Sequence, residues 1–240
     1  MPCGKFFMLA GSPRNPADPP RGEPKGRFDV LNDLRAIVFD LDGTLYVSND
    51  LGREINLAAS RYVAELKRID LVGAAALIRA TKKMLSAASG VDTTLTMAII
   101  ELGGDVRELH RRFSTEIEPE RYLKRDERVV ELLRLLGESF ELAIYTNNNV
   151  MLTTRIMKAL GVGGMFNHVF TIEDSWRPKP DRVTLDRILQ SIGRRPVECL
   201  FVGDRFDIDL RLPASLGSAV FLAKNVEELL NLIQFTSEEN

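Results

Sequence analysis

Two aspartates stand two positions apart at the start of a predicted loop, and this pair is the strongest chemical signal in the sequence. Asp40 and Asp42 belong to the segment Phe39-Asp40-Leu41-Asp42-Gly43-Thr44, which directly follows an apolar run. Because Gly43 allows the backbone to turn, both carboxylates can face one ligand from the same loop. Asp and Gly are also common in ordinary turns, so this segment alone leaves a purely structural interpretation open.

Two later segments place polar side chains where further predicted strands end, and a third lies between them in the sequence. Thr146-Asn147 offers a hydroxyl and an amide suited to phosphate oxygens, although Thr146 could also cap the following helix. Arg177-Pro178-Lys179-Pro180 holds a lysine on a loop that its prolines stiffen, although an isolated lysine is more often a solvated surface charge. Gly203-Asp204 is followed by Asp207 and Asp209. These segments favour a site over a simple turn.

Electrostatics indicate that a cation belongs among these acids. Two carboxylates about 4 Å apart repel by roughly 4 kcal/mol at an effective dielectric constant near 20. Gathering Asp40, Asp42, Asp204 and Asp209 at one sheet edge is therefore unfavourable unless Lys179 and a divalent metal offset the charge. Carboxylate, carbonyl and phosphate oxygens are ligands that Mg²⁺ prefers.

Zinc is disfavoured as that metal. Zinc sites are usually built from clustered His and Cys side chains. The two histidines, His110 and His168, are isolated in the sequence and are expected to be surface or packing residues. We therefore predict Mg²⁺.

The elements that must position these residues alternate between strands and helices. Short apolar runs predict strands, and helical periodicity predicts helices between them. The strands are expected at 36–39, 142–145, 199–202 and 219–222, with a weaker one at 168–171, and the helices at 150–160, 181–192, 207–216 and 226–233. This alternation predicts an α/β fold with a doubly wound, parallel, Rossmann-like sheet.

One long segment breaks the alternation. Between residues 48 and 126, apolar residues recur at helical spacing and glycines punctuate them, with no convincing strand. We predict an inserted α-helical cap domain at 48–126, and an α/β core domain formed by 27–47 and 127–240. Residues 1–26 are rich in Pro and Gly and lack periodicity, so a flexible tail is expected there.

The composition of the chain indicates which classes of partner and which cellular compartment are expected. Lys and Arg total 32 against 34 Asp and Glu, and no basic stretch predicts a nucleic-acid surface. No apolar run is long enough to span a membrane, and the apolar stretch after Lys5 is too short for an export signal. Cys3 and Cys199 form no disulfide framework, so a reducing cytoplasm is expected. The sequence does not predict an oligomeric state.

These four segments resemble the motifs of the haloacid dehalogenase (HAD) superfamily. That pattern runs D-x-D-G-T, then a strand ending in Ser/Thr-Asn, then a lysine, then G-D-x-x-x-x-D. Asp40 to Thr44, Thr146-Asn147, Lys179, and Gly203-Asp204 through Asp209 follow it in order and frame most of the chain. Many relatives carry Ser and Asn where Arg205 and Ile208 stand, but neither position replaces an acid.

The resemblance implies a role for each matching residue. Asp40 is the nucleophile that becomes a phosphoaspartate, and Asp42 protonates the leaving group and then activates water. The resemblance implies that Asp40, Asp204 and the backbone carbonyl of Asp42 hold Mg²⁺. The resemblance implies that the phosphate ligands are Thr146, Asn147 and Lys179. It implies that Asp209 is a supporting acid. Asp207 does not fit the pattern.

The resemblance also bears on the reaction. An acid at position 42 is typical of the phosphatases and phosphomutases of the superfamily, and the helical insert resembles its type I caps. The mutases usually carry a histidine shortly after the first motif, whereas Tyr46 to Asp50 contains none, so hydrolysis is favoured. A phosphotransferase, a phosphomutase and a non-catalytic binding protein remain alternatives.

The substrate is less constrained. The segment from Phe39 to Tyr46 and the helical insert look most like the pyrimidine 5′-nucleotidases, which implies a nucleoside monophosphate; phosphoglycolate or a sugar phosphate are alternatives. In the insert, Arg79, Lys82 and Lys83 could contact a substrate, but the sequence does not distinguish them from a solvated helix face.

Overall fold

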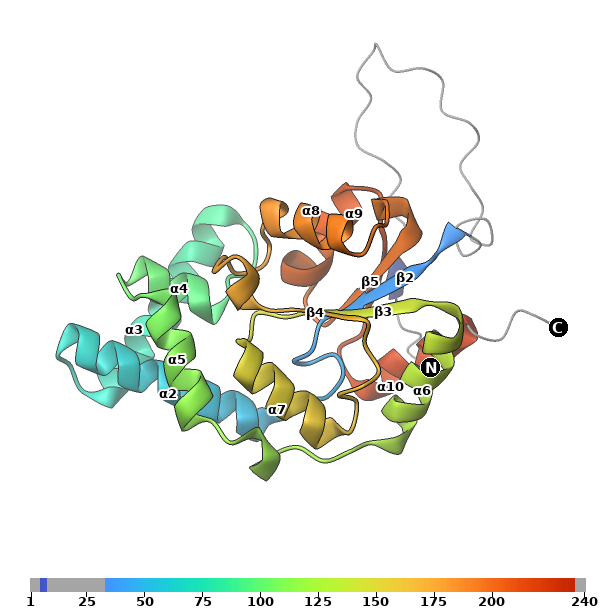
Figure 1. Cartoon of the computed structure of the whole chain (residues 1–240). Helices are drawn as coiled ribbons and strands as arrows, with labels where there is room; N and C mark the ends of the chain where they lie inside the picture. The colour runs from blue at the N-terminus through green and yellow to red at the C-terminus, as the bar shows by residue number, and fades with distance from the viewer. Residues whose placement is uncertain (1–4, 8–32, 236–240) are drawn as a thin grey trace, which may run out of the picture.

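The computed structural model describes residues 5–7 and 33–235, and a six-stranded sheet runs through its centre (Figure 1). The strand order is β1-β6-β5-β2-β3-β4. Five strands are parallel, from β6 through β4, and β1 is antiparallel to β6. The strands are β1 Lys5–Phe7, β2 Ala36–Phe39, β3 Glu141–Tyr145, β4 His168–Phe170, β5 Cys199–Gly203 and β6 Ala219–Leu222. The predicted α/β fold with a doubly wound parallel sheet is confirmed.

The sequence anticipated the five parallel strands to within one residue at each end. The sixth, β1, lies within the segment expected to be a flexible tail. Lys5 to Phe7 pair with Leu222 to Val220, so these three residues belong to the sheet rather than to a tail. The rest of 1–26 lies outside the described residues.

Alternation of side chains along the parallel strands builds two hydrophobic layers, one on each face of the sheet. On β2, Ile37 and Phe39 point into one layer while Ala36 and Val38 point into the other. Helices α6 and α7 cover the first face, and α8 and α9 cover the second (Figure 1). The helices of this part are α6 Glu127–Ser139, α7 Val150–Leu160, α8 Arg182–Ser191, α9 Arg211–Ser215 and α10 Val226–Leu229.

The end of β5 leads into an unusual turn. The predicted helix over 207–216 is instead a π-helical turn, Phe206–Leu210, followed by the short helix α9. The wider π turn buries Asp209 while leaving Asp207 partly exposed. π turns recur at functional sites because they redirect a side chain without ending the helix.

The chain between β2 and α6 is helical (left of Figure 1). It contains α2 Asn49–Lys67, α3 Leu71–Ser89, α4 Leu95–Glu101, α5 Val106–Glu116 and a 3₁₀ turn, Pro119–Arg121. Each helix begins at a polar side chain that accepts a hydrogen bond from a free backbone N–H of the first turn, and these caps are Ser48, Asp70, Thr94 and Asp105. We call residues 48–126 the insert. Its status as a separate domain stays a prediction.

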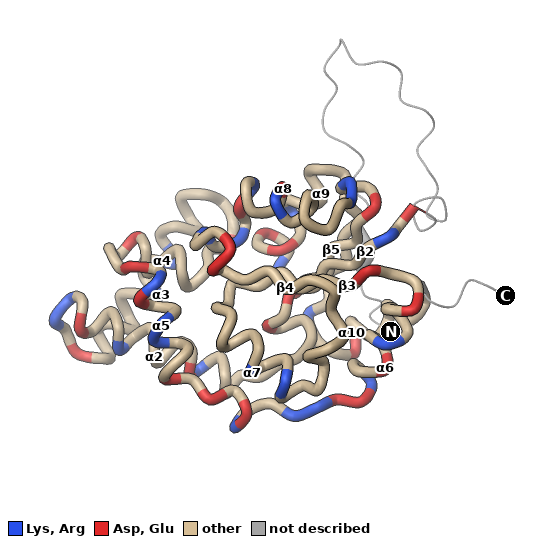
Figure 2. Tube along the Cα trace, viewed as in Figure 1, with Lys and Arg blue, Asp and Glu red and all other residues tan. Residues whose placement is uncertain are grey.

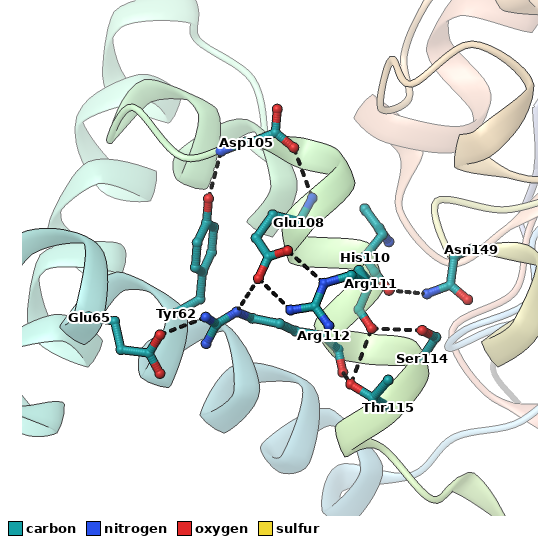
Figure 3. Close-up of polar contacts among 10 residues, drawn as sticks. All are labelled: Tyr62, Glu65, Asp105, Glu108, His110, Arg111, Arg112, Ser114, Thr115 and Asn149. Atoms are coloured by element: carbon teal, nitrogen blue, oxygen red, sulfur yellow. Dashed lines mark hydrogen bonds and ion pairs between the residues drawn. The ribbon is translucent and has the colours of Figure 1, made fainter.

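Arg112 joins two helices of the insert (Figure 3). From α5 its guanidinium binds Glu65 on α2 at 2.6 Å and Glu108 on its own helix at 2.8 Å. The guanidinium carbon also lies 5.0 Å from the ring centre of Tyr62, whose hydroxyl accepts a hydrogen bond from the Asp105 N–H. Arg112 is largely shielded from solvent but Glu65 is well exposed, so the contact with Tyr62 contributes more than the ion pair to holding α5 against α2.

Charges are distributed over the described surface without a wholly basic face in the view of Figure 2, where blue and red segments alternate along the outer helices. Within 5–7 and 33–235, every helix is too short or too polar to cross a bilayer.

Arg112→Ala is expected to lower the stability of the protein by about 1 kcal/mol, which for a chain of this size lowers the melting temperature by about 2–4 °C. The loss comes from the contact with Tyr62 and the bond to Glu65. The matched control is Arg111→Ala, since Arg111 binds the same Glu108 but is well exposed. Equal melting temperatures for the two variants would contradict the proposed bracing role of Arg112.

Candidate active site

A buried lysine lies where the loops after the parallel strands meet. The Lys179 side chain is only 2% exposed, and its Nζ donates to Asp40 Oδ1 at 2.6 Å, to Asp209 Oδ1 at 2.7 Å and to the Tyr145 carbonyl at 2.9 Å. All three ammonium hydrogens therefore have an acceptor. Burial alone would lower the pKa of Lys179, but Asp209 and Asp40 raise it above its ordinary value, so the side chain stays charged.

Backbone geometry locks this lysine in place. The Lys179 N–H donates to Asn147 Oδ1 at 2.8 Å, which ties the lysine loop to the end of β3. Asp209 in turn accepts the Arg205 N–H through Oδ2 at 3.0 Å. The loops after β2, β3 and β5 therefore share one hydrogen-bonded centre.

Asp42 has different surroundings from Asp40. Its Oδ1 accepts a short hydrogen bond from the Tyr46 hydroxyl, and its Oδ2 accepts from Asn148 Nδ2 at 2.6 Å. The Thr146 hydroxyl lies 3.5 Å from the same oxygen. Asp40 instead faces Lys179, with Thr44 Oγ1 3.4 Å from its second oxygen. One acid is thus held by a cation and the other by neutral donors.

The loop of Asp42 and the loop of Asp204 are in direct contact at Gly43. Gly43 has φ +84°, and a Cβ atom placed there would lie 2.6 Å from Asp204 Oδ2. Only glycine fits, because a side chain would collide with Asp204 and strain the backbone. This contact fixes the spacing of the acids from the two loops.

Three acids form a group suited to a hard cation. One carboxylate oxygen from each of Asp40, Asp204 and Asp209 lies within 4.8 Å of the other two. Asp204 Oδ1 is buried and has no hydrogen-bond partner among the described residues, an arrangement that a metal ligand would explain. An all-oxygen donor set fits Mg²⁺. The side chain of Asp42 is not in this group, and the metal contact predicted for Asp42 is through its backbone carbonyl.

Burial and mutual repulsion raise the pKa values of the acids. Burial is the main cause for Asp40, whose pKa rises to about 7 although Lys179 opposes the rise. Burial and Asp209 raise the pKa of Asp204 to about 6. Burial also raises the pKa of Asp42, while the hydrogen bond from Tyr46 limits the rise. A bound cation would counter these shifts, since it stabilises the ionised carboxylates.

A cavity of about 380 Å³ opens between this centre and the insert. Asp42, Asn147 and Asp204 line it from the core, and side chains of the insert line the opposite side, including Asn56, Lys82, Thr96 and His110. Its volume suits a small metabolite. The two parts are also joined directly, because Asn149 Nδ2 donates to the His110 carbonyl at 2.7 Å (Figure 3).

The structure brings all the predicted site residues to this one edge of the sheet, and their chemical roles stay predictions. Asp40, Asp42, Lys179 and Asp209 are linked by the bonds above, and Asp204 touches Gly43. Thr146 and Asn147 lie beside them; the hydroxyl of Thr146 accepts the Asn148 N–H, and Nδ2 of Asn147 is buried without a partner among the described residues. His110, expected to be a surface or packing residue, packs in the insert and lines the cavity.

Sequence reasoning missed two residues that contact Asp42. Tyr46 and Asn148 each donate a hydrogen bond to Asp42, yet the sequence motifs assign neither of them a role. Tyr46 is separated from Asp42 by three residues, and Asn148 belongs to a run of three asparagines that follows β3. Both residues lie close in sequence to the predicted motifs, and this closeness could have indicated a role in the site. A sequence does not reveal, however, which asparagine of such a run points toward Asp42.

Comparisons with known proteins give one matching family and several curated relatives. The family model of the haloacid dehalogenase-like hydrolases matches residues 34–217. The pyrophosphatase PpaX of Bacillus velezensis is 27% identical over 182 residues, covering 72% of this chain and 76% of its own. The phosphoglycolate phosphatase of Aquifex aeolicus is 27% identical over 192 residues, covering 79% of this chain and 84% of its own.

A solved structure shows the same fold. The HAD hydrolase YfnB of Bacillus subtilis, in a crystal structure with bound magnesium, matches with a TM-score of 0.55 and 20% identity. The match covers 84% of this chain and 99% of that one. At this identity the likeness concerns the fold alone.

Mg²⁺ is expected to raise the melting temperature, and more so at pH 8 than at pH 5.5. The folded-state pKa values of Asp40 and Asp204, about 7 and 6, lie above the ordinary 3.8. Without metal, these two acids therefore reduce stability as the pH rises from about 4 to 7, because the unfolded chain releases its protons first. Metal binding requires the ionised forms and reverses this loss. Asp204→Asn should abolish the Mg²⁺ shift; an unchanged shift in that variant would exclude Asp204 as a ligand.

Tyr46→Phe is expected to raise the pKa of Asp42, because the hydroxyl that stabilises the ionised carboxylate is removed. The limb of the pH–rate profile that reports Asp42 should move to higher pH, while the fold measured by circular dichroism stays the same. Tyr122→Phe is the control, since Tyr122 lies outside the cavity and the site. A profile that does not move would mean that Asp42 is not the titrating group.

Proposed function

Since the chain belongs to the haloacid dehalogenase-like hydrolases, we propose that it is a Mg²⁺-dependent phosphomonoester hydrolase that acts through a phosphorylated aspartate. The observation that carries the proposal is the pairing of Asp40 and Asp42 in different surroundings beside one cavity. Two acids in one site can divide the work of nucleophile and proton donor only if their environments differ. Here one faces a lysine and the other faces a phenol and an amide.

In the proposed first step, an Asp40 oxygen forms a bond to phosphorus as the ester P–O bond breaks. The leaving oxygen takes its proton from Asp42, whose raised pKa favours the protonated form needed for this role. Lys179 holds Asp40 in position, and its charge offsets negative charge that develops on the phosphoryl group. The product of this step is a phosphoaspartate at position 40.

In the second step, Asp42 removes a proton from water as the water oxygen bonds to phosphorus. The bond to Asp40 breaks, phosphate leaves, and both acids return to their starting forms. Asp40, Asp204 and the carbonyl of Asp42, with Asp209 nearby, would hold Mg²⁺, whose charge would offset the negative charge on the phosphoryl oxygens. Thr146 and Asn147 are proposed to donate hydrogen bonds to the same oxygens, and the buried Nδ2 of Asn147, which has no partner among the described residues, supports this.

The proposed substrate is a small phosphorylated metabolite. The resemblance to pyrimidine 5′-nucleotidases favours a nucleoside monophosphate, whereas two relatives are named for pyrophosphate and phosphoglycolate hydrolysis. A phosphoglycolate or sugar-phosphate phosphatase is therefore the alternative. The insert is proposed to act as a type I cap that closes over the cavity and excludes water. A cytoplasmic location stays a prediction from the cysteine content.

A phosphotransferase or phosphomutase of the same family would return the phosphoryl group to an organic acceptor. Product analysis with a sugar phosphate separates these classes, since only the hydrolase releases stoichiometric phosphate. A non-catalytic binding protein is the third possibility. The intact set of acids around Lys179 argues against it, because a protein without turnover has no need for this costly burial of charge.

Asp40→Asn is expected to lower phosphate release from p-nitrophenyl phosphate by about 10³-fold or more, because an amide cannot act as the nucleophile. The control is Asp186→Asn, which alters an exposed acid paired with Arg182 on α8. Both variants should keep the circular dichroism spectrum of the native protein. Full activity in Asp40→Asn would end the assignment, and turnover in EDTA would exclude the metal. A screen of phosphate esters would then rank the substrates.

A further inference from the structure

The cavity has charged residues on two sides. Among the residues that line it, Asp42 and Asp204 carry acidic side chains, and Lys82 and Arg205 carry basic ones. The ring of His110 also lines the wall, but burial lowers the pKa of His110 to about 4, so the ring is neutral. The acids belong to the reaction centre described above. The two cations have no task in that chemistry.

Arg205 offers a guanidinium that the protein does not occupy fully. Its main chain is held firmly, because its N–H binds Asp209 Oδ2 and its carbonyl accepts the Asp209 N–H at 2.9 Å. Its side chain only approaches Asp204, with Nε 3.9 Å from Oδ1, which is too long for a hydrogen bond. Among the described residues its guanidinium has no closer acceptor, so several donors remain available to an anion.

Lys82 enters the cavity from α3, on the side of the insert. It is half-buried, whereas Arg79 and Lys83 on the same helix are exposed and do not line the cavity. Burial lowers the pKa of Lys82, the charge of Arg205 lowers it further, and the exposed Asp92 acts in the opposite direction. In the described part of the chain no carboxylate pairs with Lys82 within ion-pair distance. Lys82 from the insert and Arg205 from the core thus both line the cavity, and neither side chain has a carboxylate within hydrogen-bond distance among the described residues.

We propose that Lys82 and Arg205 form a subsite for a second anionic group, a carboxylate or a phosphoryl, carried by the leaving group of the substrate. An anion there would relieve the repulsion between the two cations and fill the free donors of Arg205. The inference rests on the proposed phosphatase function, because it concerns the part of the ester that departs. The subsite narrows the substrate class to esters whose leaving group carries a second negative charge. A nucleoside leaving group carries no such charge and would leave Lys82 and Arg205 without an anionic partner.

Two matched pairs of esters test the subsite. The first pair is 2-phosphoglycolate and its carboxamide, which differ in one carboxylate charge. The second is ethylene glycol bisphosphate and 2-hydroxyethyl phosphate, which differ in the second phosphoryl group. For each pair, kcat/KM is measured with Mg²⁺ for the native protein and for Lys82→Gln, Lys82→Arg and Arg205→Gln. Lys83→Gln and Arg79→Gln are controls on the same helix, and p-nitrophenyl phosphate measures hydrolysis itself.

The native protein should prefer the doubly charged ester of at least one pair by about tenfold or more, the scale of one charge-assisted hydrogen bond. The preferred pair identifies the carboxylate or the phosphoryl group. Lys82→Gln and Arg205→Gln should bring that ratio close to one, Lys82→Arg should keep most of it, and both controls should keep all of it. Because the readout is a ratio, partial loss of folded protein does not imitate the effect.

Equal rates within both pairs for the native protein, or an unchanged ratio in Lys82→Gln, would overturn the subsite while hydrolysis of p-nitrophenyl phosphate upheld the phosphatase. Failure to hydrolyse every ester, p-nitrophenyl phosphate included, would overturn the proposed function and the subsite with it.

Discussion

The burial of one ammonium group is the interaction on which the rest of the site depends. Lys179 brings a positive charge out of water, which costs several kcal/mol unless acceptors surround it. Asp40, Asp209 and the Tyr145 carbonyl provide those acceptors and come from three separate places in the chain. The lysine therefore does more than supply charge. It makes the positions of β2, β3 and the π turn after β5 mutually dependent, so that the acids are held before any ligand arrives.

Burial of the site also changes the pKa values of the acids around Lys179. A dry pocket raises the pKa values of Asp40, Asp42 and Asp204, and the local partners then separate their behaviour. Asp40 shares a cation, Asp42 accepts from Tyr46 and Asn148, and one oxygen of Asp204 lacks a partner among the described residues. Three aspartates of the same intrinsic acidity thus become three different groups. The immediate partners of each carboxylate account for this difference.

Much of the fold and most of the site could be predicted from the sequence, because both follow from short-range patterns. Buried parallel strands appear as apolar runs, and the carboxyl ends of those runs carry the polar motifs. The sequence does not separate α5 from its neighbours in the insert, since only Leu109, His110 and Phe113 of its eleven residues are buried. Strand β1 escaped notice because its short apolar stretch lies in a Pro- and Gly-rich segment, and only its pairing with β6 shows that it joins the sheet. Local patterns do not report such long-range pairings.

The sequence also does not show in which direction a side chain points from its helix or loop. Arg79, Lys82 and Lys83 were equivalent in the sequence, yet only Lys82 turns toward the cavity, because the rotation of α3 is set by tertiary packing. The same holds for Asn148 within its run of asparagines. The sequence pattern predicts an ordinary helix where the structure has the π turn Phe206–Leu210, since one additional residue in a turn leaves no compositional trace.

The Asn149 side chain makes two independent hydrogen bonds, one within the core and one to the insert. Its Oδ1 starts α7 by accepting the Leu152 N–H, while its Nδ2 holds the His110 carbonyl of the insert. An outward swing of the insert would break the second bond and leave the first intact. The Asn149 bond to the Leu152 N–H would then keep the loop of Thr146 and Asn147 in the same conformation whether or not the insert is in contact with the core.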